Sequence, residues 1–216
     1  MKEPGLDRRI VKTKKALRDA LTSLMKEKTF DEITVLDLTT RADINRGTFY
    51  LHYRDKYDLL QQSEEEILNG VLKIRSEKKK RITKEELPNF DYMNKPLPLV
   101  EELFKYLQEN GEFVALLLGP GGNPAFHVKL KEIMQRTMAQ SVLSRLAEDR
   151  EELIVPMEYL SAYAISAQLG VIQHWLHEGM KESPRQVSLI LSRLIFSNPF
   201  TLYKDQAPEK RKKPGD

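Results

Sequence analysis

Apolar residues recur every three or four positions along most of this chain, which is the spacing that places them on one face of an α-helix. The first such face is formed by Ile10, Leu17, Ala20, Leu21 and Leu24. It predicts a helix from about Asp7 to Lys28. No segment shows a convincing alternation of apolar and polar positions, which would be typical of a strand. The pattern therefore predicts an all-α protein with about nine helices.

The segment 34–53 predicts two short helices joined by a tight turn. Thr34 and Asp37 have the spacing of a helix cap, so the first of the two helices begins at Thr34 and ends near residue 41. Asp43 lies in the turn and is one of the few residue types other than glycine that tolerate a left-handed backbone. Asn45 can cap the next helix, residues 46–52. The side chains expected in the core around this segment are Leu38, Phe49, Tyr53 and Leu60.

The rest of the chain predicts longer helices separated by proline-containing breaks. Further apolar stripes lie at residues 57–72, 100–107, 113–118, 126–142, 156–175 and 187–195. Residues 83–98 contain three prolines and no apolar period, so we interpret them as a loop between two domains. The basic residues after position 203 indicate a disordered tail over 204–216.

The composition is that of a soluble globular protein, with 40% hydrophobic and 31% charged residues in 216 positions. The absence of cysteine excludes a disulfide scaffold, a cysteine-ligated zinc site and a cysteine nucleophile. The N-terminal residues have no apolar region typical of a secretory signal. The uncharged run 159–177 contains serine, glutamine and histidine, so we interpret it as a packed helix and not as a membrane span. We therefore expect a cytoplasmic protein.

The excess positive charge lies at the N-terminal end of the chain. Residues 1–60 carry 13 basic and 10 acidic side chains, which equals the net charge of +3 for the whole sequence. Residues 1–15 alone carry six basic side chains against two acidic ones. A basic segment in front of a compact unit is typical of a protein that binds nucleic acid, although such runs are more often only a solvated face.

Two short helices joined by a tight turn, with a third helix before them, match the plan of a helix-turn-helix. The second helix of such a pair offers its exposed face to the major groove of DNA. Here that face is expected to carry Arg46, Gly47, Thr48, Tyr50 and His52. Arginine can bind guanine edges, the threonine methyl group can contact thymine, and tyrosine and histidine suit phosphate contacts. Glycine lets the backbone approach the duplex closely.

The residue order in this segment resembles the tetracycline-repressor (TetR) family of bacterial transcription regulators. The resemblance rests on Ile33-Thr34-Val35, on Asn45-Arg46-Gly47-Thr48-Phe49-Tyr50, and on His52-Tyr53 with Lys56, and it covers about residues 8–70. It implies DNA contacts from Thr34, Asn45, Arg46, Gly47, Thr48, Tyr50, His52 and Lys56. Asp43 stands where the family pattern usually has glycine, Asn45 where serine is usual, and Tyr53 where phenylalanine is commoner. Asn45 and Arg46 leave the operator sequence open.

Residues 97–197 resemble the C-terminal regulatory region of one TetR subgroup, which implies a regulatory and dimerisation domain over 83–203. The matching residues include Leu116-Leu117-Leu118-Gly119-Pro120 and the run from Trp175 to Pro184. By this resemblance, helices at about 156–178 and 184–197 pair with their copies in a homodimer that binds a palindromic operator on double-stranded DNA. The small residues of the first of these helices agree, because they allow two helices to approach closely.

The same resemblance implies release from DNA when a small-molecule effector binds among the C-terminal helices. Candidate lining residues are Phe104, Leu107, Phe113, Phe126, Met134, Tyr159 and Tyr163. For any one of them ordinary core packing is the more common explanation, because aromatic and methionine stripes are common in cores. A regulator with no small-molecule effector is therefore the alternative.

Enzymatic alternatives have weaker support in the sequence. His174 and His177, followed by Glu178, suggest a metal-dependent hydrolase, but no second cluster of ligands accompanies them. The loop 119–123 lacks the lysine and serine or threonine that end a phosphate-binding loop. We therefore expect a protein that is not an enzyme and that has no cofactor and no metal.

Overall fold

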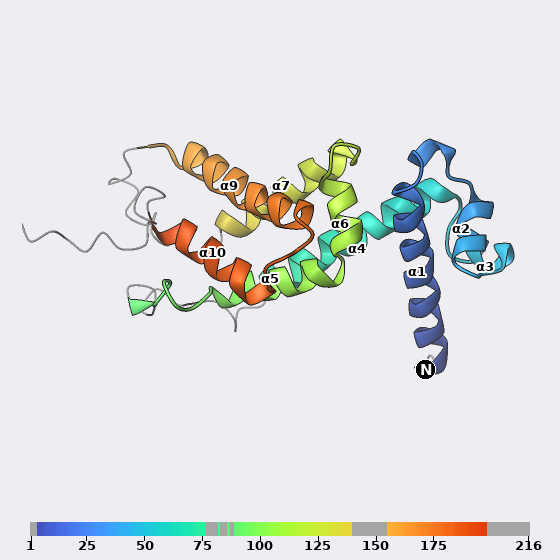
Figure 1. Ribbon diagram of the computed structural model, residues 1–216, viewed down its shortest axis with the longest axis horizontal. Helices are drawn as coiled ribbons and strands as arrows, with labels where there is room; N and C mark the ends of the chain where they lie inside the picture. Colours follow the sequence, from blue (N-terminus) through green and yellow to red (C-terminus); the bar gives the residue numbers. More distant parts are fainter. Residues whose placement is uncertain (1–3, 77–81, 83–85, 87–88, 140–154, 198–216) are drawn as a thin grey trace, which may run out of the picture.

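The computed structural model describes residues 4–76, 82, 86, 89–139 and 155–197, and these form nine α-helices, one short 3-10 helix and no strand (Figure 1). The all-α prediction is confirmed. In chain order the elements are α1 (Pro4–Met25), η1 (Phe30–Glu32), α2 (Val35–Arg41), α3 (Arg46–Tyr50), α4 (Lys56–Ser76), α5 (Pro98–Glu109), α6 (Gly111–Leu118), α7 (Pro124–Ala139), α9 (Met157–His177) and α10 (Pro184–Phe196).

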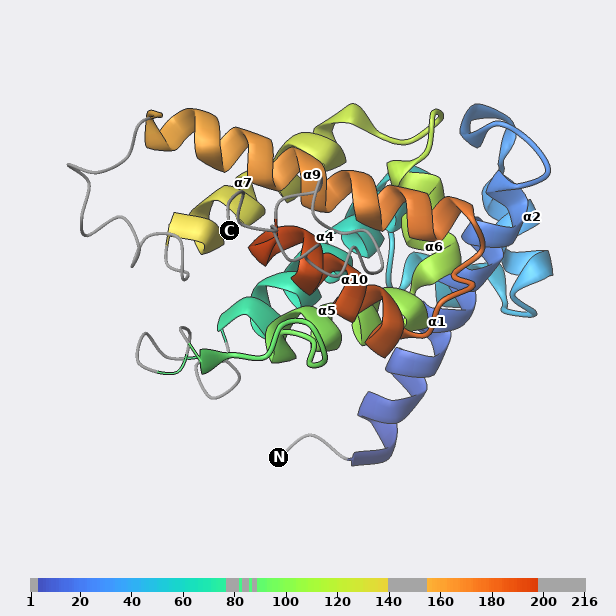
Figure 2. The ribbon, with the colours of Figure 1, turned by 60° about the vertical axis from the view of Figure 1, so that its left-hand side comes forward.

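The helices form two packed groups that share α4 (Figures 1 and 2). The head consists of α1, η1, α2, α3 and the first half of α4. The body consists of the second half of α4 with α5, α6, α7, α9 and α10. Helix α4 contacts α1 in the head and both α5 and α7 in the body. Because one continuous helix crosses the junction, the domain boundaries at 8–70 and 83–203 stay predictions.

Burial in the head follows the helical stripes that the sequence predicts. The side chains with at most 1% exposure there are Leu17, Leu21, Ile33, Leu38, Phe49 and Leu59. Tyr53 is buried as expected, whereas Leu60 is only partly buried against this core. Each fully buried side chain of this size stabilises the folded state by about 1.5–3 kcal/mol relative to an exposed one. The apolar stripes therefore supply most of the energy that holds α1, α2, α3 and α4 together.

Several helix ends differ from the sequence prediction by a few residues. Helix α1 begins at Pro4 and ends at Met25, whereas we expected about 7–28. Helix α3 ends at Tyr50, where the N–H of Leu51 closes the last turn on the carbonyl of Gly47. Helix α9 runs from Met157 to His177, which agrees with the predicted bounds of about 156–178 to within one residue at each end. Helix ends depend on local capping, which the apolar period does not encode.

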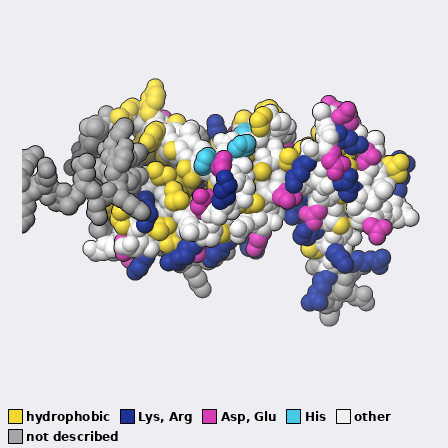
Figure 3. Space-filling view, in the orientation of Figure 1, with side chains coloured by type: hydrophobic (Ala, Val, Ile, Leu, Met, Phe, Trp, Pro, Cys, Tyr) yellow, Lys and Arg dark blue, Asp and Glu magenta, His cyan; other side chains and the backbone are white. Residues whose placement is uncertain are grey.

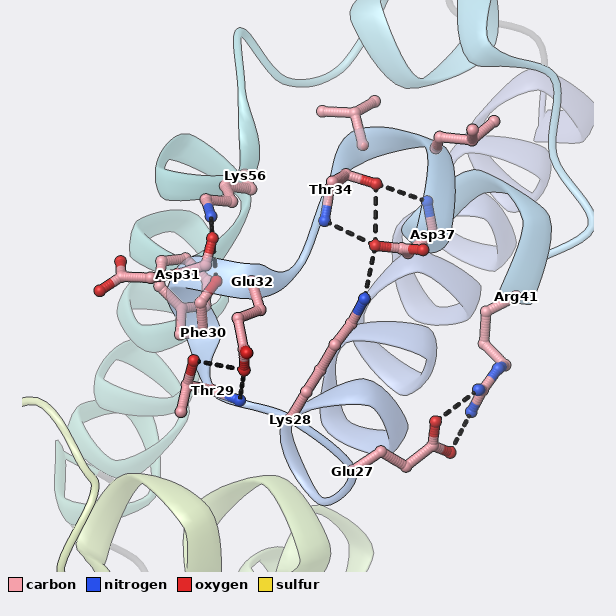
Figure 4. Close-up of polar contacts among 12 residues, drawn as sticks. Glu27, Lys28, Thr29, Phe30, Asp31, Glu32, Thr34, Asp37, Arg41 and Lys56 are labelled. Carbon is pink, nitrogen blue, oxygen red and sulfur yellow. Dashed lines mark hydrogen bonds and ion pairs between the residues drawn. The ribbon is translucent and has the colours of Figure 1, made fainter.

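A group of polar contacts fixes α2 against the end of α1 (Figure 4). The Asp37 carboxylate accepts hydrogen bonds from the Thr34 N–H at 2.9 Å, the Thr34 hydroxyl at 2.8 Å and the Lys28 ammonium at 2.7 Å. At the other end of α2, the Arg41 guanidinium donates to both carboxylate oxygens of Glu27, each at 2.8 Å. The first turn and the last turn of α2 are therefore both joined to residues that follow directly on α1.

In the body, aromatic packing and a few buried hydrogen bonds join helices that are distant in sequence. The Phe104 and Trp175 rings meet edge to face with centroids 5.1 Å apart, which joins α5 to α9. The Trp175 indole donates to the carbonyl of Glu182 at 2.9 Å. Ser192 of α10 accepts the N–H of Leu97 at 2.8 Å, just before α5 begins. These contacts place α5, α9 and α10 side by side.

Parts of the sequence prediction lie outside the described residues. They are the charged end of the fourth helix at 77–81, the end of the apolar stripe at Ser141 and Val142, and the tail 204–216. The loop predicted over 83–98 is described only in part. None of the helices in the described ranges is both long and apolar enough to cross a membrane.

We predict that Asp37→Asn lowers the thermal unfolding midpoint by a few degrees at neutral pH, because the cap and the Lys28 contact are weakened together. The hydrogen bond from Lys28, followed by those from the Thr34 backbone and hydroxyl, lowers the pKa of Asp37 from 3.8 to about 2. A lowered pKa stabilises the folded state above pH 3.8, and this contribution is lost as the pH falls toward 2.

The midpoints of the wild type and Asp37→Asn should therefore differ by a constant amount from pH 7 to about 5 and converge below pH 4. Calorimetric melts across this range provide the measurement. Asp31→Asn, on the exposed surface of η1, is the matched control. Equal melting of Asp37→Asn and wild type at pH 7 would contradict the role given to this carboxylate.

Candidate nucleic-acid interface

The turn between α2 and α3 has the geometry that the sequence predicts. Asp43 adopts a left-handed backbone with φ of 53°, which confirms that expectation. The N–H of Ala42 donates to Leu38 at 2.9 Å and the N–H of Ile44 donates to Thr39 at 3.0 Å, so the backbone of the turn is hydrogen-bonded. The Asn45 side chain then accepts the N–H of Gly47 at 2.8 Å and caps α3. A closed turn and a capped start together fix the direction of α3.

Helix α3 has one face in the core and one face in solvent. Phe49 is fully buried and anchors the helix, whereas Arg46, Gly47 and Tyr50 are exposed and Thr48 is half-buried. The Arg46 guanidinium donates to the Tyr50 hydroxyl at 3.3 Å and lies 5.7 Å from the centre of its ring. The exposed face of α3 therefore offers a cation held against an aromatic ring, with groups suited to base edges and phosphates.

The other predicted contact residues lie around α3 and differ in their exposure and in the hydrogen bonds that they already form. Thr34 is exposed at the start of α2, but its hydroxyl is already engaged with Asp37. His52 is half-buried beside Tyr53, with ring centroids 6.3 Å apart. The Lys56 ammonium donates to the carbonyls of Phe30 at 3.0 Å and Asp31 at 2.7 Å (Figure 4). Lysine has three donors, so a phosphate contact there would share an ammonium that already joins α4 to η1.

Sequence reasoning did not single out two exposed leucines of the head. Leu51 follows α3 directly and is 80% exposed, and Leu36 in the first turn of α2 is 63% exposed. Both are apolar groups on the same unit as α3, and apolar side chains can contact the thymine methyl group. The sequence could have indicated that both leucines are exposed, because neither has the helical spacing that would place it on the apolar face with the core residues.

Only some of the residues predicted to line an effector site line the same cavity. Leu107, Phe126 and Met134 line a cavity of about 20 Å³ inside the body. Phe104 and Phe113 are buried in the core but do not line that cavity. Tyr159 and Tyr163 are 74% and 66% exposed on α9, so they face outward from the protomer. Periodicity alone could not separate these cases, because both faces of α9 are apolar.

One charged side chain also lines the cavity and was absent from the sequence prediction. Arg75, near the end of α4, is 8% exposed and lies among apolar side chains that include Val71, Leu103 and Met134. The sequence held no obvious signal for this position, because arginine near a helix end is usually exposed. The lining of this cavity is therefore apolar apart from one charged side chain.

A wider groove of about 880 Å³ lies where the head meets the body. Its walls come from the end of α1, the end of α6 and the end of α9, and they include Phe30, Leu116 and His174. The Lys26 ammonium lies 3.0 Å from the Glu112 carboxylate and spans this junction. The groove is therefore a feature of the contact between the two groups of helices.

In the described part of the chain, the histidines at the end of α9 have no cluster of metal ligands around them. His174 and His177 are exposed, and the Glu178 carboxylate accepts a hydrogen bond from Lys181 at 2.6 Å, which lowers the pKa of Glu178. Among the described residues there is no group of three or more histidine, aspartate or glutamate side chains that could hold a metal ion.

The outer faces of α9 and α10 are unusually apolar. Exposed residues on these helices include Tyr159, Ala162, Tyr163, Ala167, Gly170, Ile190, Leu194 and Ile195. Figure 3 shows hydrophobic side chains over the part of the body that holds both helices. A Cβ atom placed on Gly170 would meet no other atom within 4 Å. The protomer therefore leaves open space next to this glycine.

Comparison with known proteins agrees with the geometry of both parts. Residues 17–62 match the family described as bacterial regulatory proteins, tetR family. Residues 94–197 match a TetR-type transcriptional regulator C-terminal region. The HTH-type transcriptional regulator YxbF of Bacillus subtilis (strain 168) is 23% identical over 201 residues, which are 91% of this chain and 48% of that protein. The chain thus spans about half the length of this curated relative.

Solved structures show the same fold at low sequence identity. A TetR transcriptional regulator from Streptococcus agalactiae 2603V is 23% identical with a TM-score of 0.52, and the alignment covers 88% of this chain and 96% of that one. FadR from Bacillus subtilis, in complex with stearoyl-CoA, is 18% identical with a TM-score of 0.57, covering 84% and 97%. With both regions matched, the chain belongs to the TetR family of transcriptional regulators, a family of DNA-binding proteins that are not enzymes.

Proposed function

We propose that this protein is a homodimeric repressor that binds a palindromic operator through α3 and is released by a small-molecule effector. The observation that carries the proposal is the exposed Arg46–Tyr50 pair on a capped helix whose neighbour α2 is joined to α1 at both ends. Such a helix can enter the major groove without a change of shape. A DNA-binding regulator acts in the compartment that contains the DNA, which in a bacterial cell is the cytoplasm.

The dimer is supported by the outer faces of α9 and α10. Monomeric proteins rarely leave a large contiguous apolar patch in water. Two copies joined along these helices would cover Tyr159, Tyr163 and Ile190, and Gly170 would allow the two α9 helices to approach closely. A two-fold dimer places its recognition helices about 34–36 Å apart, which suits two half-sites one turn of DNA apart.

The effector is supported by the interior cavity and by one of the similar structures. FadR of Bacillus subtilis, which shares the fold, holds stearoyl-CoA. In this chain the apolar cavity of about 20 Å³ would have to expand, because sites for ligands of that kind occupy about 300–1,000 Å³. Regulation without an effector is the alternative.

Operator DNA selected from a random pool tests the interface. We predict that Tyr50→Ala weakens binding to every duplex, whereas Tyr50→Phe, which keeps the ring under Arg46, weakens it less. Arg46→Lys should change the base preference at one position by about 1–3 kcal/mol. Gel-shift titrations give the affinities, and Val128→Ala on the exposed surface of α7 is the control. Unchanged operator affinity in Tyr50→Ala would overturn the assignment of α3.

Lys56→Ala should weaken binding to all duplexes in similar proportion, and it should also lower the melting temperature, because its bonds to the η1 carbonyls are removed. Gel shifts and thermal melts on the same sample separate the two effects. A variant that melts like the wild type would show that these two bonds do not stabilise the head.

The dimer is tested at Gly170. We predict that Gly170→Leu folds normally, since the protomer has room there, but raises the dimer dissociation constant on the order of 10–100-fold by holding the two α9 helices apart. Light scattering at micromolar concentration gives the mass, and circular dichroism checks the fold. An exposed control is Glu109→Leu at the end of α5. A dissociation constant equal to that of the wild type, measured by light scattering over a dilution series, would place the interface elsewhere.

Effector binding is tested with stearoyl-CoA and with free fatty acids. A ligand present at 100 times its dissociation constant stabilises the native state by about 2.7 kcal/mol, so it should raise the melting temperature of the protein. In a separate gel-shift measurement, the same ligand should release the protein from operator DNA. Leu107→Trp should fill the cavity and abolish both responses while DNA binding persists. An unchanged response in Leu107→Trp would place the effector outside the cavity, with the junction groove as the next candidate.

A further inference from the structure

The N-terminal turns of α1 extend beyond the core of the head. The first fully buried side chain of the helix is Leu17, and Arg8 lies nine residues before it, or about 14 Å along the axis. Figures 1 and 2 show this end of α1 standing clear of α2 and α3. We name residues 8–15 the basic arm. Burial in the head does not explain why the helix continues this far.

Most charged side chains of the basic arm have no counter-charge among the residues that the structure describes. Arg8, Arg9 and Lys12 are exposed and form no ion pair with any described residue. Lys15 is paired with Asp19 at 2.6 Å. Figure 3 shows Lys and Arg side chains gathered on this projecting end. Since residues 61–216 carry equal numbers of basic and acidic side chains, the arm holds the main excess of positive charge on the chain.

The arm has a fixed direction relative to α3. Its base rests on the head through Lys14, whose ammonium lies 3.4 Å from the Gln62 side-chain oxygen and 5.8 Å from the centre of the Tyr53 ring. Tyr53 comes three residues after the last residue of α3. The other end of α1 is joined to α2 by the Lys28–Asp37 and Glu27–Arg41 contacts. These contacts join the arm and α3 to the same packed head.

We infer that the basic arm is a second DNA contact, which binds backbone phosphates beside the half-site occupied by α3. The inference rests on the proposed function. Duplex DNA carries one negative charge per 1.7 Å of its axis, so a helix that extends about 14 Å from the head can meet several phosphates. Flexible arginine and lysine side chains suit phosphates without reading bases. The arm adds affinity and salt dependence but no base preference.

The first test is the salt dependence of binding by full-length protein carrying Arg8→Gln, Arg9→Gln and Lys12→Gln. Removal of one phosphate contact should reduce the slope of log affinity against log salt by about 0.9. Affinity should fall about tenfold or more at physiological salt, equally for operator and random duplexes. The matched control replaces three exposed cations of α7, Lys129→Gln, Lys131→Gln and Arg136→Gln, and should behave like the wild type.

The second test uses the absence of cysteine from the chain. Lys12→Cys carries a single thiol that can be labelled with an iron–EDTA reagent, which cleaves DNA close to it. Cleavage beside each half-site is expected, and the same label at Lys131→Cys should give none.

An unchanged salt slope in the triple variant, or cleavage no stronger than that of the Lys131→Cys control, overturns the inference. Binding of the arm to anionic vesicles or acidic peptides without cleavage of DNA overturns it as well. Tyr50→Ala keeps the two proposals apart. If that variant loses operator binding while the arm variant does not, α3 reads DNA and the arm does not contact it. If the wild type binds no duplex, the proposed function fails first.

Discussion

The orientation of the helix-turn-helix depends on one carboxylate. The same oxygen of Asp37 accepts the Thr34 N–H, the Thr34 hydroxyl and the Lys28 ammonium, so it caps α2 and joins that helix to the end of α1. Exposed ion pairs contribute little free energy, and the buried stripes supply most of the stability of the head. The polar contacts decide instead where α2 starts and which way it points. A recognition helix is useful only in a defined direction, so this geometric role outweighs the energy.

The head and the body are joined by a few structural links, which limits how one can affect the other. Helix α4 is continuous through both parts, and Lys26 at the end of α1 pairs with Glu112 of α6. Packed helices transmit displacement because interiors are dense and have low compressibility. Any ligand that enlarges the interior cavity must move the helices around it, and α4 and α6 are two of them. Helix α4 continues into the head, and α6 contacts α1.

Two surfaces of the protomer, one apolar and one basic, suit different kinds of partner. The outer faces of α9 and α10 are apolar and include Gly170, which has open space beside it, so they suit a second copy of the chain. The N-terminal end of α1 carries Arg8, Arg9 and Lys12 without counter-charges among the described residues, so it suits a polyanion. Burial of apolar area and pairing of charge are separate driving forces, and the two surfaces lie at separate ends of the molecule (Figure 1).

Local chemistry determined much of this protein from the sequence alone. The helical period of Leu17, Leu21 and Leu24, the capping residues Thr34 and Asn45, and the left-handed tolerance of Asp43 act over a few residues, so they can be read without a fold. Long-range placement could not be read in this way. The Lys56 bonds to η1, the burial of Arg75 and the outward position of Tyr163 each depend on which helices become neighbours. A periodic pattern says that a side chain lies on a face, whereas only the packing of the helices decides whether that face meets the core, another chain or water.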